Sequence, residues 1–145
     1  FVDQQTIESF GGLKINDLDE GLKKSDIISL SVPLNTETHH MINLTKLKLM
    51  KNNAIIINTS RGGVINEEDL NTALEEEIIS GAGLDVFEKE PPDVNNKLLK
   101  NKKVFLSPHS ATFTKECTES MGVQTVQNVI DFFENKLNKL MIVKL

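Results

Sequence analysis

The chain lacks tryptophan and tyrosine, and it has one cysteine, Cys117, among its 145 residues. Its acidic and basic residues are mixed and sum to a net charge of -5, so it has no basic, aromatic surface of the kind that binds nucleic acid. A single cysteine forms neither an internal disulfide nor a cysteine-rich metal site, which favours a reducing, cytoplasmic setting. We therefore expect neither nucleic acid nor a metal ion as a partner.

Long hydrophobic runs are also absent. No apolar stretch approaches the roughly 18 residues that a membrane-spanning helix needs, and no secretion signal opens the chain. A content of 39% hydrophobic and 26% charged residues is ordinary for a globular domain of this length. These features predict a soluble globular protein that has no membrane partner.

Arginine is almost absent as well, because Arg61 is the only arginine among 16 basic residues. Its guanidinium group forms a planar fork that binds a carboxylate through two parallel hydrogen bonds, which lysine cannot do. Gly62 and Gly63 follow it, and we expect them to let the backbone turn sharply so that Arg61 projects from the turn. Arg61 is thus a candidate for binding a carboxylate ligand, and the alternative is a surface arginine without a role.

Four short apolar segments, each bounded by turn-forming residues, predict strands that are buried on both faces. Helix-like stretches lie between them, each preceded by an Asp or Asn that can cap it. The strands are expected at residues 27–32, 54–57, 82–86 and 104–106, and the helices at residues 18–24, 44–50 and 67–79. Strand starts lie roughly 20 to 30 residues apart, the length of a βαβ unit, so the sequence predicts an α/β fold with a parallel sheet.

Further elements are expected near the two ends of the chain. A short strand at residues 1–2 would end at Asp3, and a long helix is expected over about residues 114–135, followed by a tail at residues 137–145. Val126, Ile130 and Phe133 recur at helical spacing, which predicts a core-facing stripe on the long helix. The pattern indicates no second domain boundary.

Polar residues follow the ends of the predicted strands. Because the carboxyl ends of parallel strands lie at one edge of a sheet, where ligands bind, we expect Arg61, Asp85, Glu90 and His109 to meet there. A histidine titrates near neutral pH, at about 6.5, which suits His109 to exchange a hydroxyl proton. Glu90 is placed to hydrogen-bond the imidazole and stabilise its cation. A carboxylate clamp and an acid/base histidine are what reversible reduction of a 2-oxo acid requires, given a source of hydride.

Three motifs resemble those of the D-2-hydroxyacid dehydrogenases, over essentially the whole chain. They lie at residues 32–43, 56–65 and 81–91, and Ser-Pro-His at residues 107–109 completes the third. The resemblance implies a Rossmann-like NAD-binding domain and hydride transfer between NAD and a small 2-oxo or 2-hydroxy acid. The stretch Ser-Pro-His-Ser-Ala-Thr favours glyoxylate or hydroxypyruvate reductases within the family.

The resemblance also implies a role for each matching residue. Arg61 would bind the substrate carboxylate, His109 would be the general acid in reduction, and Glu90 would be the partner of that histidine. Asp3 would bind the ribose hydroxyls of adenosine, which favours NAD over NADP because the carboxylate repels a 2′-phosphate. The remaining positions implied to contact the cofactor, beside Arg61 and His109, are Val32, Pro33, Thr38, Thr59, Ser60 and Asp85.

The family pattern places a Gly-x-Gly-x-x-Gly turn roughly 20 residues before Asp3, with a substrate domain in front of it. We therefore expect a C-terminal fragment that covers most of the NAD-binding domain, without the first strand, the glycine-rich turn and the N-terminal substrate domain, and with little activity alone. Resemblance further implies a homodimer. The alternatives are a corepressor-like binding protein that senses NAD and an inactive truncated remnant.

Overall fold

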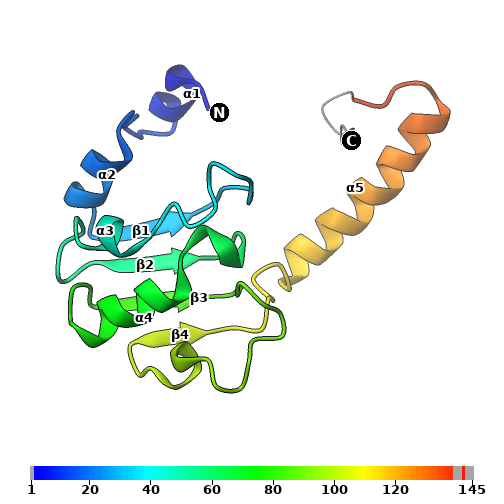
Figure 1. Cartoon of the computed structure of the whole chain (residues 1–145). Helices are drawn as coiled ribbons and strands as arrows, with labels where there is room; N and C mark the ends of the chain where they lie inside the picture. The colour runs from blue at the N-terminus through cyan, green and yellow to red at the C-terminus, as the bar shows by residue number, and fades with distance from the viewer. Residues whose placement is uncertain (1, 139–141, 143–145) are drawn as a thin grey trace. The chain divides into compact units, whose positions relative to one another are not determined.

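The computed structural model, drawn in Figure 1, describes residues 2–138 and 142. The chain divides into two compact units, Phe1–His109 and Ser110–Leu145, a division that the sequence pattern did not indicate. Among the described residues, no helix combines the length and the apolar character needed to cross a membrane. Nor do they include three or more His, Cys, Asp or Glu grouped so as to hold a metal ion.

The first unit is built on a sheet of four parallel strands in the order β1-β2-β3-β4. The strands are β1 (Ile27–Leu30), β2 (Ile55–Asn58), β3 (Gly81–Leu84) and β4 (Val104–Leu106). Each forms where the sequence predicts a strand, within two residues at either end. Because all four run in the same direction, their carboxyl ends share one edge of the sheet (Figure 1).

The predicted helices also form, and their predicted caps are confirmed. The side chains of Asp17, Asn43 and Asn66 accept hydrogen bonds from backbone N–H groups in the first turns that follow them. The helices are α2 (Leu18–Lys24), α3 (Leu44–Leu47) and α4 (Glu67–Glu75), with short 3₁₀ turns η1 (Gly62–Val64) and η2 (Lys97–Lys100). The helices α3 and α4 end earlier than predicted, by three and four residues.

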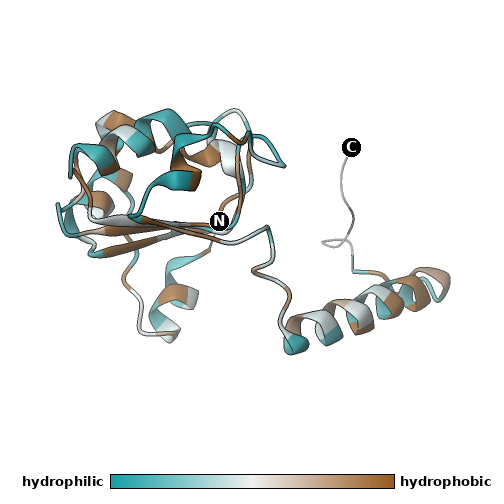
Figure 2. Ribbon diagram, turned by 90° about the horizontal axis from the view of Figure 1, so that it is seen from below, coloured by the Kyte–Doolittle hydropathy of each residue, from teal (hydrophilic) through white to brown (hydrophobic). Residues whose placement is uncertain are grey.

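Helices cover one face of the sheet, as Figure 2 shows. Leu22, Leu47 and Leu74, from α2, α3 and α4, are fully buried together with Ile56 of β2. Removing such side chains from water supplies about 1.5 to 3 kcal/mol each, so this layer is the main source of stability in the first unit. The strand ends are therefore anchored by a packed core.

The opposite face of the sheet carries exposed apolar side chains. Ile27, Ile55 and Phe105 are all exposed, so the prediction that every strand is buried on both faces is wrong for the described residues. Burial of a parallel strand on both sides requires a second layer of helices. Within the described part of the first unit, α2, α3, α4 and η2 belong to one layer, and the apolar side chains of the other face are exposed.

The predicted first strand does not form at Val2, and Phe1 lies outside the described residues. Asp3 instead caps the helix α1 (Gln4–Ser9), because its carboxylate accepts hydrogen bonds from the backbone N–H and the hydroxyl of Thr6, each at 2.8 Å. A strand needs a neighbour for its backbone groups, and β1 pairs only with β2 in the described sheet. Without that pairing, local capping decides the conformation of this segment.

The second unit contains the long helix α5 (Lys115–Phe133), which lies within the predicted residues 114–135 and is capped by Thr114. Its predicted core-facing stripe is wrong for the described residues: Val126, Ile130 and Phe133 are 61%, 43% and 77% exposed. Helical spacing shows that apolar residues share a face, but burial needs a second layer. The rest of the described second unit supplies none, and most of the predicted tail lies outside the described residues.

Candidate functional site

Asn58, the last residue of β2, shapes the loop that carries Arg61. Its side-chain oxygen accepts hydrogen bonds from the backbone N–H of Ser60 at 3.0 Å and from its hydroxyl at 2.8 Å, and its amide donates to the carbonyl of Arg61 at 2.9 Å. A buried amide with all these partners fixes the loop backbone. The Arg61 side chain is exposed, and its Nη1 donates to the carbonyl of Ser60 at 2.7 Å. Sequence analysis missed Asn58, although a polar residue that ends an apolar strand was the available signal.

Gly62 is required by a close approach between two loops. A Cβ atom at this position would lie 1.9 to 2.3 Å from the carbonyl group of Phe87 and the backbone nitrogen of Glu88. The backbone of Gly62 is not left-handed, so the predicted sharp turn is not what demands glycine here. Its missing side chain instead lets the loop after β3 pack against the loop after β2, which brings the segments of Arg61 and Glu90 together.

Glu90 and His109 form the predicted pair. Oε2 of Glu90 lies 2.7 Å from Nδ1 of His109, while Oε1 accepts the backbone N–H of Phe87 at 3.0 Å. The hydrogen bond from His109, the bond from Phe87 and the charges of His109 and Arg61 hold the pKa of Glu90 below its usual range. Among these causes the bond from His109 contributes most and the charge of Arg61 least.

His109 adopts an unusual backbone conformation, with φ of 51°. The left-handed region is uncommon for a residue with a side chain, and such residues cluster at functional sites, where the surrounding structure holds them. Here the bond to Glu90 holds the imidazole at the carboxyl end of β4. The strained backbone and the fixed ring together orient His109 toward the adjoining pocket.

A pocket of about 390 Å³ opens beside this pair, within the size range of small-ligand sites. Its polar groups include Asp85, which is buried at the end of β3 and accepts a hydrogen bond from the hydroxyl of Ser107 at 2.5 Å. Ser107, Glu90 and His109 complete the polar lining, and the other lining residues are apolar. These apolar residues are Phe87, Pro91, Pro92, Leu99, Leu106 and Pro108.

Not every predicted site residue reaches this pocket. Arg61 is not part of its lining, although its charge acts on Glu90. The hydroxyl of Thr38 donates to the carbonyl of Pro33 at 2.6 Å and accepts the N–H of Asn35 at 2.9 Å, so it shapes the loop after β1. Val32 packs against the core.

Two further predicted residues are exposed and stand outside this pocket. Thr59 is exposed on the loop after β2. Asp3 stands at the cap of α1, where the hydrogen bonds from Thr6 lower the pKa of its carboxyl group. The structure therefore brings Asp85, Glu90 and His109 together in one pocket and places Arg61 on the adjacent loop.

Comparisons with known proteins show the family and the fold to which the chain is similar. The profile of the family described as "D-isomer specific 2-hydroxyacid dehydrogenase, NAD binding domain" matches residues 2–111. The chain is 49% identical over 126 residues to a glyoxylate reductase of Thermococcus litoralis, covering 87% of the chain and 38% of the relative. It spans about two fifths of the length of the curated glyoxylate reductases that it matches.

Two solved structures share the fold at substantial identity. A glyoxylate reductase from Paecilomyes thermophila matches with a TM-score of 0.77 and 38% identity, over 86% of the chain and 38% of that structure. A D-lactate dehydrogenase from Aquifex aeolicus, complexed with NAD and lactic acid, matches with a TM-score of 0.78 and 35% identity, over 93% and 45%. The predicted Rossmann-like α/β fold is confirmed.

Proposed function

Because the chain belongs to the D-isomer specific 2-hydroxyacid dehydrogenases and matches their NAD-binding domain, we propose that the protein carrying it reduces a small 2-oxo acid with NADH and catalyses the reverse oxidation. Glyoxylate or hydroxypyruvate is the proposed substrate, since the motif around His109 favours these reductases and the matched relatives include glyoxylate reductases. The bonded Glu90–His109 pair beside a pocket of ligand size is the observation that supports the proposal.

The edge of the sheet suits NAD, which supplies or accepts the hydride when bound. Asp85 presents a carboxylate at the end of β3, in a pocket with apolar walls. A carboxylate suits the N–H donors of a carboxamide and the positive charge of an oxidised nicotinamide ring, while apolar walls suit a flat ring. The proposed contacts, beyond Asp85, are Asp3, Val32, Pro33, Thr38, Thr59, Ser60, Arg61 and His109.

His109 is proposed to move the proton of the reaction. Its Nδ1 is bonded to Glu90, so Nε2 is the ring atom available to a ligand. In reduction, Nε2 donates its proton to the carbonyl oxygen of the substrate, and in oxidation it accepts the hydroxyl proton. The low pKa keeps Glu90 ionised, and its negative charge stabilises the imidazolium and fixes the ring.

Arg61 is proposed to bind the substrate carboxylate through its planar fork. Arg61 is exposed, and Asn58 fixes the backbone of Arg61 through a hydrogen bond to its carbonyl. Gly62, the neighbour of Arg61, packs against the backbone of Phe87 and Glu88, so the loop of Arg61 lies beside the loop that carries Glu90. In this proposal, Arg61 binds the substrate and His109 transfers the proton.

The natural protein that carries this chain tests the proposal directly. NADH oxidation is followed by absorbance with glyoxylate, hydroxypyruvate and pyruvate, each at several concentrations. We expect turnover with one or more of them, highest with glyoxylate or hydroxypyruvate. A protein that binds NADH yet oxidises it with none of these acids would contradict the proposal and favour a cofactor-sensing role.

The 145 residues alone are proposed to have little or no activity, because Arg61 is exposed and stands outside the pocket lining. The same absorbance assay on the purified chain checks this expectation, and turnover equal to that of the natural protein would refute it. A homodimer is proposed from the family resemblance, and analytical ultracentrifugation of the natural protein measures it.

A further inference from the structure

A second histidine–glutamate pair lies outside the pocket. Nε2 of His40 is 3.1 Å from Oε1 of Glu88, and both side chains are only about a third exposed. His39 is exposed, whereas its neighbour His40 is only partly exposed. His40 also has a left-handed backbone, with φ of 50°, and its N–H donates to the carbonyl of Gly63 at 2.7 Å.

Glu88 is also bound to the start of α4, through the same oxygen that contacts His40. Its Oε1 accepts the backbone N–H of Glu67 at 3.0 Å, and Oε1 of Glu67 accepts the backbone N–H of Glu88 at 2.6 Å. The second oxygen of Glu67 accepts the side-chain amide of Asn96 at 2.6 Å. This reciprocal exchange joins the loop after β3 to the helix that follows β2.

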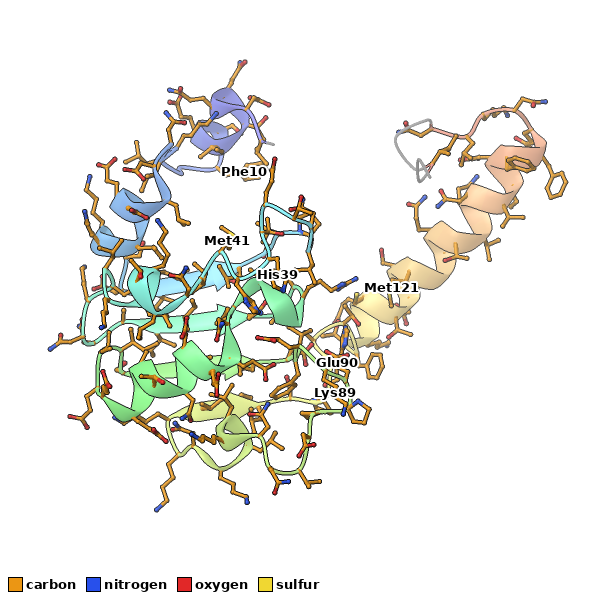
Figure 3. The ribbon with its side chains drawn as sticks, viewed as in Figure 1. Phe10, His39, Met41, Lys89, Glu90 and Met121 are labelled. Atoms are coloured by element: carbon orange, nitrogen blue, oxygen red, sulfur yellow. The ribbon has the colours of Figure 1, made fainter. Side chains whose placement is uncertain are left out.

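The segment that carries His40 is joined to the segment that follows Arg61. Ile42 and Ile65 form a parallel bridge, in which the N–H of Ile42 donates to Val64 at 3.2 Å and the N–H of Asn66 donates to Ile42 at 3.0 Å. Figure 3 places His39, next to His40, and Glu90 on the side of the sheet toward which the strands point. The loops after β1, β2 and β3 therefore meet at His40, Glu67 and Glu88, which we call the loop junction.

We propose that His40 is a positioning residue of the reaction: by binding Glu88 it holds the loop after β3 so that Glu90 stays bonded to His109. The proposal rests on the proposed function. Glu88 directly follows Phe87, whose N–H binds Glu90, and its backbone packs against Gly62, the neighbour of Arg61. A shift of Glu88 therefore displaces the groups that orient both the carboxylate of Glu90 and the guanidinium of Arg61.

Kinetics of the natural protein test this role. We expect His40→Ala to lower kcat with the favoured 2-oxo acid by about 10- to 100-fold, because small misplacements of catalytic groups have effects of this size. His40→Gln keeps an N–H donor near the position of Nε2 and should restore most of the rate. The ring of His39 stacks on that of His40, with centroids 3.9 Å apart, so His39 is not a suitable control. The matched control is Glu37→Gln on the same loop, where the side chain is exposed, and it should leave kcat unchanged.

A double-mutant cycle separates the His40–Glu88 contact from independent effects. If the contact carries the role, Glu88→Ala should add little to the loss caused by His40→Ala. Effects that multiply would overturn the proposal, as would an unchanged kcat in His40→Ala. Where an alanine variant fails to fold, His40→Phe keeps a ring at this position but has no N–H donor for Glu88, and it should still lower kcat.

The pKa of Glu90 provides a measurement that does not depend on activity. It is followed by carbon NMR of the labelled carboxyl group, and we expect His40→Ala to raise it toward the usual value of 4.5, because the bonds from His109 and Phe87 loosen. An unchanged pKa in folded His40→Ala would overturn the positioning role. If the wild-type protein reduces no 2-oxo acid, the proposed function fails, while this titration still decides whether His40 positions Glu90.

Discussion

Two histidine–glutamate pairs stand at the same edge of the sheet with different surroundings. In His109–Glu90, Nδ1 is bonded to the carboxylate, and Nε2 has no partner among residues 2–138 and 142. In His40–Glu88, Nε2 faces the carboxylate and Nδ1 lies 3.4 Å from the side-chain amide of Asn66. Both histidines have a left-handed backbone, so strain alone does not distinguish them.

The unoccupied ring nitrogen, more than the pairing with glutamate, distinguishes the proposed proton donor His109 from the proposed positioning residue His40. An imidazole whose two nitrogens are both engaged can join loops but has no atom left for a ligand. The one beside the pocket keeps an atom available and has a carboxylate to stabilise its cation.

The same substitution at both histidines should have unequal consequences. His109→Gln removes the proton donor and should lower kcat in the natural protein by about 100- to 10,000-fold, the usual contribution of general acid catalysis. His40→Gln keeps a donor for Glu88 and should cost less than about tenfold, the factor that 1.36 kcal/mol represents. Steady-state kinetics with the favoured 2-oxo acid measure kcat for both variants. Equal losses of kcat would contradict the different roles proposed for His109 and His40.

Arg61→Lys should weaken substrate binding more than it disturbs either pair. Lysine keeps the positive charge but loses one of two parallel hydrogen bonds, worth about 1.5 to 3 kcal/mol to a charged group. We expect kcat/KM for the 2-oxo acid to fall about 10- to 100-fold, with the pKa of Glu90 still low. Lys48→Arg, an exposed exchange in the opposite sense, is the control and should change nothing. An unaltered kcat/KM would show that Arg61 does not bind the substrate carboxylate.

Gly62→Ala should disturb both pairs at once, because the new Cβ would meet the backbone of Phe87 and Glu88. Overpacking of this kind costs about 1 to 3 kcal/mol of unfolding free energy. Gly122→Ala in α5 is the matched control, since a Cβ there meets nothing within 4 Å and alanine favours a helix. Thermal denaturation should show a lower Tm for the first variant and no loss for the second.

The low pKa of Glu90 predicts a small dependence of stability on pH. A carboxyl group whose pKa is lowered by folding stabilises the protein above its unfolded value, and the gain is lost as pH falls through the folded value. His109→Phe removes the main cause of the shift, so the pKa should rise toward 4.5. The stability difference between wild type and variant should therefore shrink from pH 7 to pH 3. Urea titrations at these two pH values measure the free energy of unfolding of both proteins. A difference that grew toward pH 3 would contradict His109 as the main cause of the low pKa of Glu90.

Much of the fold could be predicted because its signals are local. The strand β4 and the helix α2 have the predicted bounds, and the caps Asp17 and Asn43 act as expected. The parallel arrangement followed from the alternation of strands and helices. That arrangement also predicted that Asp85 and His109, far apart in sequence, share one edge of the sheet.

The predictions that were wrong concern residues whose conformation or burial depends on a segment far away in the sequence. Val2 has a strand-like sequence but no paired strand in the described sheet, so Asp3 caps a helix instead. Val126 has the spacing of a core residue but no layer to cover it within its unit. Periodicity predicts which residues share a face, and it carries no information about what lies opposite.

The sequence by itself determined the order of strands and helices, their caps and the residue types available for chemistry, because backbone preference and periodicity act over a few neighbouring positions. Only the tertiary structure decided that the Gly62 backbone passes against Phe87, that Asn58 fixes the loop of Arg61, and that His40 binds Glu88. These contacts join segments whose approach depends on strand register and on the course of the loops. Such distances are set when the whole sheet packs, and no short stretch of sequence encodes them.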